Sequence, residues 1–368
     1  MPGIITHNKL LKETILYLQK KKKKNYLLRS IQSLFSEKDR LTSALFGSIG
    51  PNIYDYIPKW SRGNFFGSNI SFSMHNGYSR KIIESLYNII FSQKDKNTEW
   101  SSLQRAYLYG FISHIISDSI FHPFIFYFSG FTNSNSKTVN GFFREQFLLY
   151  QYAVDLYFLL FRTDAKSFKF SIQEMLPIKK QSRLKWLYPP IKSIILESLF
   201  NDFKDAYKVI SLKKPKEGNS YQKLIQSNSQ IGYLDAIPYL LSWIYRLKMT
   251  KNDRVRDLIN KARKKNFTLS DITVLYPQIK TFDLHIVNHY RERWQYPTGS
   301  TSIHYESMEN LFQISCEKIV DAWERVESSI YENKMAVFSD IIVSNAYTGV
   351  NDQNFSQMKQ QNPIKIRY

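Results

Sequence analysis

Histidine and carboxylate side chains recur at helical spacing in the first third of the chain. His114 and Asp118 are four residues apart, and His122 follows Asp118 by another four. Residues four apart share one face of a helix, so this spacing suits the binding of one metal ion. Asp118 could also bridge two ions, because hydrolytic metal pairs lie roughly 3.5–4 Å apart. The alternative is a hydrogen-bonded His–Asp pair in the core.

The other donors limit what kind of metal site the chain can build. Cys316 is the only cysteine, so an intramolecular disulfide and a thiolate-based zinc or iron–sulfur site are excluded. Any metal must be held by histidine, aspartate or glutamate. His285 and His289 are also four apart, but Arg291 and Arg293 would oppose a cation, and a helix surface explains their spacing.

The surroundings of the His114–Asp118–His122 series resemble a known family. Residues 113–123 read Ser-His-Ile-Ile-Ser-Asp-Ser-Ile-Phe-His-Pro, and before them come Thr6-His7, the turn Gly47-Ser48-Ile49-Gly50-Pro51-Asn52, and His75. This order is similar to the zinc-dependent phospholipase C family. That family combines an early Thr-His, a Gly-x-x-x-Pro-Asp turn, a middle histidine, a Ser-His-x-x-x-Asp-x-x-x-His-Pro helix and a final His-x-x-x-Glu.

The resemblance covers about residues 1–165, and the segment 294–299 is more weakly similar to the C-terminal part of longer bacterial members. It implies an all-α bundle with metals held between helices, and one or two zinc ions. The ligands it implies are His7, His75, His114, Asp118 and His122. The implied substrate is a phospholipid or another phosphoester.

Two departures from the family pattern stand in the way of catalysis. The turn aspartate, expected to act on the nucleophilic water, is Asn52 here, and an amide cannot accept a proton as a general base. Asp55, three residues on, could replace it. The final His-x-x-x-Glu aligns with Phe147 and Gln151 if Asp155 anchors the register, and no histidine occurs between His122 and His285.

Helical periodicity is the main signal for the elements that must position these residues. With 13 glycines and 12 prolines in 368 residues, the chain has few of the turn-forming residues that the many short strands of an all-β fold need. The pattern predicts an all-α, multi-helix bundle. Helices are expected near residues 10–18, 26–35, 82–90, 103–121, 142–161, 191–209, 234–248, 253–265 and 277–293, with a last one beginning after Ser302.

The predicted organisation has three parts. Residues 1–165 form a zinc-dependent phospholipase C-like helical domain, residues 166–345 a C-terminal helical part packed on it, and residues 346–368 a flexible tail. The apolar stretch Tyr107–Phe131 is long enough to span a bilayer, but it carries His114, Asp118, His122 and Pro123, so it is interpreted as a buried helix. Without a signal peptide or a membrane span, a cytoplasmic location is expected.

A net charge of +20 suggests anionic surroundings: nucleic acid, acidic lipid headgroups or a phosphorylated substrate. The basic runs are Lys20–Lys24, Lys179–Lys180, Lys213–Lys216 and Arg254–Lys265. No zinc-finger, basic-zipper or RNA-recognition signature accompanies them, so nucleic acid has only the charge in its favour. Peripheral contact with an anionic membrane fits the resemblance better, and the oligomeric state stays open.

Two functions from different classes remain. The first is a metal-dependent phosphodiester hydrolase, in which the histidines and Asp118 bind zinc and Asn52 and Asp55 occupy the catalytic turn. The second is a non-catalytic binding or scaffolding protein on the same fold, a pseudoenzyme, because a base and two ligands are replaced together.

Overall fold

The fold is a bundle of helices around one long central helix. The structure, a computed structural model, describes residues 3–21, 25–57, 67–181, 184–210, 233–265, 274–299 and 302–364. Its α-helices are α1 (Ile4–Lys21), α2 (Tyr26–Ser36), α3 (Lys38–Gly47), α4 (Gly67–His75), α5 (Ser79–Phe91), α6 (Glu99–Ser129), α7 (Lys137–Leu156), α8 (Pro189–Asp202), α9 (Lys204–Ile210), α11 (Tyr233–Lys248), α12 (Asp253–Lys265) and α13 (Met308–Glu332). The predicted all-α class is confirmed.

Helix α6 forms the centre of the core. It is apolar nearly all round and almost completely buried, and α1, α3, α5, α7, α8 and α13 all pack against it. Thr98 caps its first turn through a hydrogen bond from the Ser101 amide. The interpretation of Tyr107–Phe131 as a buried helix is therefore correct. Among the described residues, no helix combines the length and apolar character needed to cross a membrane.

The crossing of α3 and α6 is made close by two glycines. A side chain at Gly110 would place its Cβ 1.9 Å from the Ala44 carbonyl oxygen, and one at Gly47 would lie 2.2 Å from the Tyr107 carbonyl oxygen. The two backbones are therefore in direct contact, which only glycine allows. This contact fixes the turn after α3 against the middle of α6.

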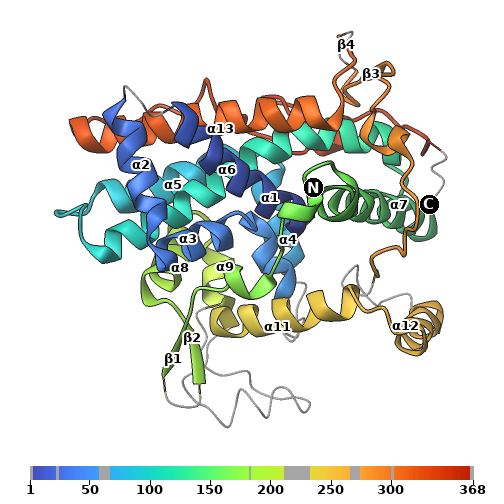
Figure 1. The fold of residues 1–368 in the computed structure, drawn as a ribbon, viewed down its shortest axis with the longest axis horizontal. Helices are drawn as coiled ribbons and strands as arrows, with labels where there is room; N and C mark the ends of the chain where they lie inside the picture. The colour runs from blue at the N-terminus through green and yellow to red at the C-terminus, as the bar shows by residue number, and fades with distance from the viewer. Residues whose placement is uncertain are drawn as a thin grey trace.

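Helix α13 covers α6 and contacts α1 and α2 (Figure 1). Ser307 and Asn310 form a capping box at its start, five residues later than the expected position after Ser302. The Trp323 indole donates to the Tyr109 carbonyl at 2.9 Å, which ties α13 to α6. Asn333 ends the helix in a left-handed conformation.

Two helix predictions need correction. Residues 277–293 were expected to form a helix, but within them only η7 (Leu284–Val287), a short 3-10 turn, is helical. The Asp283 side chain accepts from the His285 amide, and Asn288 and Arg291 adopt positive φ angles, which stop helical propagation. The helix expected at 191–209 is divided into α8 and α9, because Phe203 leaves the helical conformation (φ −135°, ψ 60°).

Two small antiparallel hairpins interrupt the helices. They are β1 (Ile178–Gln181) with β2 (Leu184–Leu187), and β3 (Trp294–Gln295) with β4 (Ile303–His304). The basic run Lys213–Lys216 lies outside the described residues. The flexibility of residues 346–368 stays a prediction. In the structure, residues 346–364 contact the core, and Phe131 and Gln361 pair through their backbones.

Candidate metal centre

Three elements bring histidines to one aspartate inside the bundle. Asp118 lies on α6 between His114 and His122, α1 supplies His7, and α4 ends at His75. Asp118 Oδ1 lies 3.1 Å from His7 Nε2, and its Oδ2 lies 3.0 Å from the Nε2 atoms of both His75 and His114. The Nε2 atom of His122 is 3.9 Å from Oδ2. All five residues named from the sequence are together, and all are buried.

Three of the donor atoms form a triangle with equal sides. The Nε2 atoms of His75 and His114 are 3.0 Å apart, the same distance that separates each of them from Asp118 Oδ2. Ligands of tetrahedral zinc at roughly 2.0–2.1 Å stand about 3.3 Å from one another. The triangle therefore has nearly the dimensions of one face of such a site. His7, His114 and Asp118 form an overlapping group with donor atoms within 4.8 Å of one another.

The hydrogen bonds at the far side of each ring assign its tautomer. The Nδ1 atoms of His75, His114 and His122 contact the carbonyl oxygens of Ser71 at 2.6 Å, Ser48 at 3.0 Å and Ala346 at 2.7 Å. A carbonyl only accepts, so each Nδ1 carries the proton. A neutral ring then has a free lone pair on Nε2.

His7 reaches the same state through a hydroxyl. Ser117 Oγ donates its proton to the His114 carbonyl at 2.8 Å, so it accepts from His7 Nδ1 at 3.1 Å. Four Nε2 atoms thus converge on a carboxylate. Among the described residues, His7 Nε2, His122 Nε2 and both Asp118 oxygens have no hydrogen-bond partner. In neutral rings, the Nε2 lone pairs repel one another and the carboxylate, and a bound cation would remove that repulsion. Histidine nitrogens and a carboxylate are also donors that suit zinc.

The pKa shifts within the cluster also favour metal binding. Burial lowers the pKa of His114, and burial lowers that of His122 much further, so both rings are neutral at pH 7. Burial by itself would raise the pKa of Asp118, but the charges of His114, His122 and His7 in their protonated forms lower it well below its usual range, so the carboxylate is ionised. His114 and His122 are therefore neutral donors beside a buried anion, which is the protonation state that metal binding needs.

The turn that follows α3 lies directly against His114. It contains η2 (Gly50–Tyr56), and Gly50 has a φ of 59°. A Cβ at Gly50 would stand 2.3 Å from the His114 ring, so this glycine is required both by its conformation and by the close approach. The early glycines of the motif therefore let the turn touch the candidate ligand.

Asn52 and Asp55, the two residues predicted for catalysis, lie on η2. Asn52 is buried and its side-chain oxygen accepts from Ser71 Oγ at 3.3 Å, and the Ser71 carbonyl in turn contacts His75. Asp55 is half-buried, and its charge helps to raise the pKa of Tyr347, although burial is the larger cause. Both residues thus stand close to the cluster, Asn52 on its His75 side.

The position of His7 depends on Asp155, which served in the sequence analysis only to align the family's final motif. Asp155 on α7 accepts from the Thr6 amide at 2.9 Å, from the Thr6 hydroxyl at 2.6 Å and from the Tyr276 hydroxyl at 2.6 Å. It acts as an N-cap for α1 supplied by another helix. A Cβ at Gly3 would lie 2.0 Å from the Asp155 carboxylate, so a larger residue at this position would displace the group that caps α1.

This buried carboxylate makes stability depend on pH. Burial raises the pKa of Asp155 from 3.8 to about 6, although Thr6 and Tyr276 oppose the rise. The folded state then binds the proton more tightly than the unfolded state, so this contribution is fully present below pH 4 and is lost as pH rises to 6. The loss is about 3 kcal/mol at most. We expect denaturant unfolding from pH 4 to 7 to show this fall relative to Asp155→Asn, and parallel curves for the two proteins would contradict it.

The C-terminal segment completes the cluster, which the sequence did not predict. The Ala346 amide donates to the His75 carbonyl at 2.8 Å, while its own carbonyl holds His122. The Tyr347 ring lies 4.8 Å from the His122 ring and 5.2 Å from the His75 ring, between centroids. No spacing or motif marks these residues, because they meet the histidines only through the fold.

In the alignment anchored on Asp155, an aromatic residue stands at the position of the family's final histidine. Phe147 on α7 stacks on Phe126, with ring centroids 4.6 Å apart, and its centroid lies 6.2 Å from that of His122. Gln151, one turn further, is buried. The space beside His122 is thus filled by an apolar ring instead of a donor.

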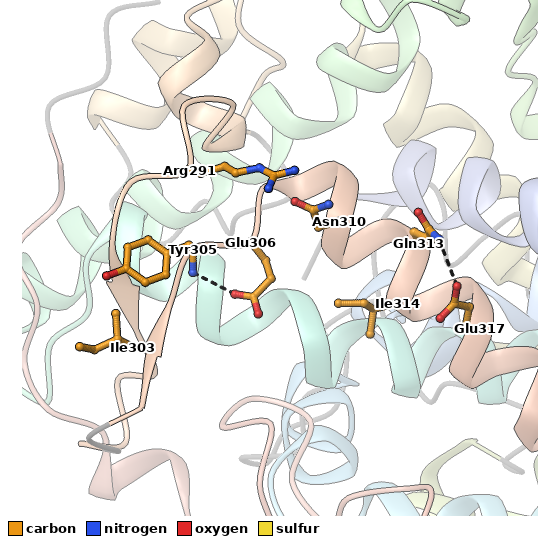
Figure 2. A pocket seen from close by; sticks show the side chains of 8 residues that line it. All are labelled: Arg291, Ile303, Tyr305, Glu306, Asn310, Gln313, Ile314 and Glu317. Atoms are coloured by element: carbon orange, nitrogen blue, oxygen red, sulfur yellow. Dashed lines mark hydrogen bonds between the residues drawn. The ribbon is translucent and has the colours of Figure 1, made fainter.

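Away from the cluster, the second histidine pair forms no comparable group with other described residues. His285 pairs with Glu292 at 3.0 Å on the surface, with both side chains about half exposed. A pocket of about 470 Å³ lies between β4 and α13 (Figure 2). It is lined by Arg291, Ile303, Tyr305, Glu306, Asn310, Gln313, Ile314 and Glu317, and it shares no residue with the histidine cluster.

Together, the helical fold and the buried His–Asp cluster define an all-α protein with a candidate metal centre. A family model described as zinc dependent phospholipase C matches residues 6–209, more than half of the chain. The chain therefore belongs to the zinc-dependent phospholipase C family. The match extends beyond residue 165, where the sequence resemblance was placed. Comparisons with curated proteins and with solved structures gave no match.

Proposed function

We propose that this protein is a zinc-dependent phosphodiester hydrolase acting on phospholipids. Family membership supports a metal-dependent, phospholipase-like function. The observation that carries the proposal is the convergence of four histidine Nε2 atoms on one buried carboxylate. In this proposal His75, His114 and Asp118 hold one zinc ion. His7 and the second Asp118 oxygen contribute to that ion or to a second one, with His122 at the edge of the set.

Zinc, when bound here, would polarise the phosphate and lower the pKa of a water molecule. The chain's own residues then have three tasks. The carbonyls of Ser48, Ser71 and Ala346 keep the histidines in the donor tautomer. Asn52 orients water through its amide without taking a proton, and Asp55 is the nearby carboxylate that accepts one.

The direct test combines metal content with turnover. The purified protein is expected to contain at least one zinc per chain and to hydrolyse a chromogenic phosphocholine ester. A chelator should stop the reaction and added zinc should restore it. A protein that binds zinc but turns over no ester, across several headgroups, would contradict the hydrolase proposal.

Replacing Asn52 by aspartate tests the position at which the family's general base is missing. Asn52→Asp restores the carboxylate that the family has in this turn, so we expect hydrolysis to rise by about 100-fold or more, since general-base catalysis contributes typically 10²–10⁴-fold. The measurement is kcat/KM on the same ester at saturating zinc. Asn69→Asp, on the neighbouring helix α4, is the control for added charge. An unchanged rate in Asn52→Asp would assign the base to another residue, with Asp55→Asn as the next variant.

A second candidate is a non-catalytic binding protein on this fold. Phe147 beside His122 favours it, because a packed ring stands where the family places a zinc ligand. This candidate predicts bound zinc or an intact fold without turnover, and no gain of activity in Asn52→Asp. The same two measurements therefore separate the two functions.

A further inference from the structure

Helix α12 stands apart from the rest of the molecule. Figure 1 shows it at the lower right, beyond the end of α11, to which residues 249–252 join it. Two hydrogen bonds of Arg256 join it to neighbouring segments: Nη1 donates to the Thr250 carbonyl and Nη2 donates to the Tyr276 carbonyl, both at 3.0 Å. The Tyr276 hydroxyl donates to Asp155 in the core, so Arg256 links the helix to a residue that is anchored there.

The sequence of α12 is both basic and amphipathic. Val255, Leu258, Ile259 and Ala262 follow the i, i+3, i+4, i+7 spacing of one apolar stripe. The helix also carries Arg254, Arg256, Lys261, Arg263, Lys264 and Lys265 against Asp253 and Asp257, a net charge of +4 over 13 residues. This composition is typical of helices that lie in a lipid–water interface.

Among the described residues, this apolar stripe is only partly covered. Leu258 is 67% exposed, Ala262 is exposed, and Val255 and Ile259 are only half-buried. The adjoining helix α11 exposes two aromatic residues one turn apart, Trp243 at 62% and Tyr239 at 40%. Tryptophan and tyrosine favour the interfacial zone of membranes, because their rings are apolar and their polar atoms still reach water.

We infer that α12, with the exposed aromatic residues of α11, is the surface by which this protein docks on anionic phospholipid membranes. The helix charge complements acidic headgroups, and Leu258 enters the acyl boundary while the basic residues contact phosphates. An exposed leucine and tryptophan add nothing to phosphate contacts with nucleic acid, so the lipid surface fits better. The inference rests on the proposed function for its substrate, since a phospholipid hydrolase must reach a membrane, and it names the surface that does so.

The test is vesicle binding by full-length protein, measured without any turnover. Vesicles of phosphatidylcholine alone are compared with vesicles containing phosphatidylserine. The double variant Leu258→Glu/Lys261→Glu is compared with a matched control, Leu16→Glu/Lys318→Glu, which alters an equally charged pair of exposed residues on α1 and α13. Because Leu258 and Lys261 are exposed, both variants should unfold like the wild type.

We expect the wild type to bind the phosphatidylserine vesicles, less tightly as salt rises. The α12 variant should bind them at least about 20-fold more weakly, since each basic charge near the surface is worth roughly fivefold. The control variant should weaken vesicle binding by less than half of the fold-change seen for the α12 variant. Equal binding by the α12 variant and the wild type, equal binding to both kinds of vesicle, or binding to an oligonucleotide duplex but to no vesicle would each overturn the inference.

Hydrolysis of a soluble, monomeric phosphocholine ester separates this inference from the proposed function. The α12 variant should hydrolyse that ester at the wild-type rate. Vesicle binding without ester hydrolysis would remove the proposed enzyme and keep the docking surface. Ester hydrolysis with unaltered vesicle binding in the α12 variant would remove the docking surface alone.

Discussion

Asp118→Asn is expected to abolish zinc binding at the triangle and to lower hydrolysis by about three orders of magnitude. The carboxylate supplies the negative charge of the cluster, and its two oxygens face different histidines. An asparagine has the same shape but no charge. Metal stabilisation of a phosphoryl group amounts to several kcal/mol, and each 1.36 kcal/mol is tenfold in rate. The measurements are zinc per chain by plasma mass spectrometry and kcat/KM on the chromogenic ester.

Asp321→Asn is the matched control for this variant, because it removes one carboxylate from the exposed side of α13. It should leave zinc content and rate unchanged. Wild-type zinc content in Asp118→Asn would mean that the ion is held elsewhere. The His–Asp cluster would then be a hydrogen-bonded core feature.

The largest effect on stability is expected for Gly110→Ala, which should lower the free energy of unfolding by about 3 kcal/mol or more. Its Cβ would meet the Ala44 carbonyl oxygen at 1.9 Å, and backbone atoms cannot rotate away as a side chain does. Helices α3 and α6 must therefore separate. Because the Ser48 carbonyl that holds His114 follows α3 directly, zinc affinity should also fall, by about 10–100-fold.

Gly141→Ala serves as the control, since Gly141 is an exposed helical glycine on α7 with no heavy atom within 4 Å of its would-be Cβ. Alanine there should stabilise the protein by about 0.5–1 kcal/mol. Denaturant unfolding of both variants gives the comparison. If the two alanines had similar effects, the close helix crossing would not be a determinant of stability.

Much of the fold was open to prediction, because helix formation depends on local periodicity. The apolar spacing along α1, α5, α6 and α13 indicates helices that the structure contains. The prediction failed at residues 277–293, where apolar residues occur at helical spacing but side-chain hydrogen bonds and positive φ angles at Asn288 and Arg291 give an irregular chain. Those local contacts leave no mark on hydrophobic periodicity.

The candidate site, like the fold, was only partly predictable from the sequence. The types and spacing of His114, Asp118 and His122 follow from the sequence, since residues four apart on a helix share a face whatever surrounds them. The order of Thr6-His7, the glycine turn and His75 also indicates the family, because each is a short local motif. Zinc as the implied metal followed from that resemblance, and the geometry fits it.

Only the tertiary structure decided how the histidines and Asp118 meet and which tautomer each histidine adopts. Ala346 and Tyr347 reach the histidines from more than 200 positions away, and Asp155 caps α1 from α7. Such contacts depend on the packing of whole helices, which no local pattern encodes. The donor tautomer of each histidine depends on a carbonyl or hydroxyl from the surrounding chain, so the chemistry of the cluster was settled by the fold while its residues were set by the sequence.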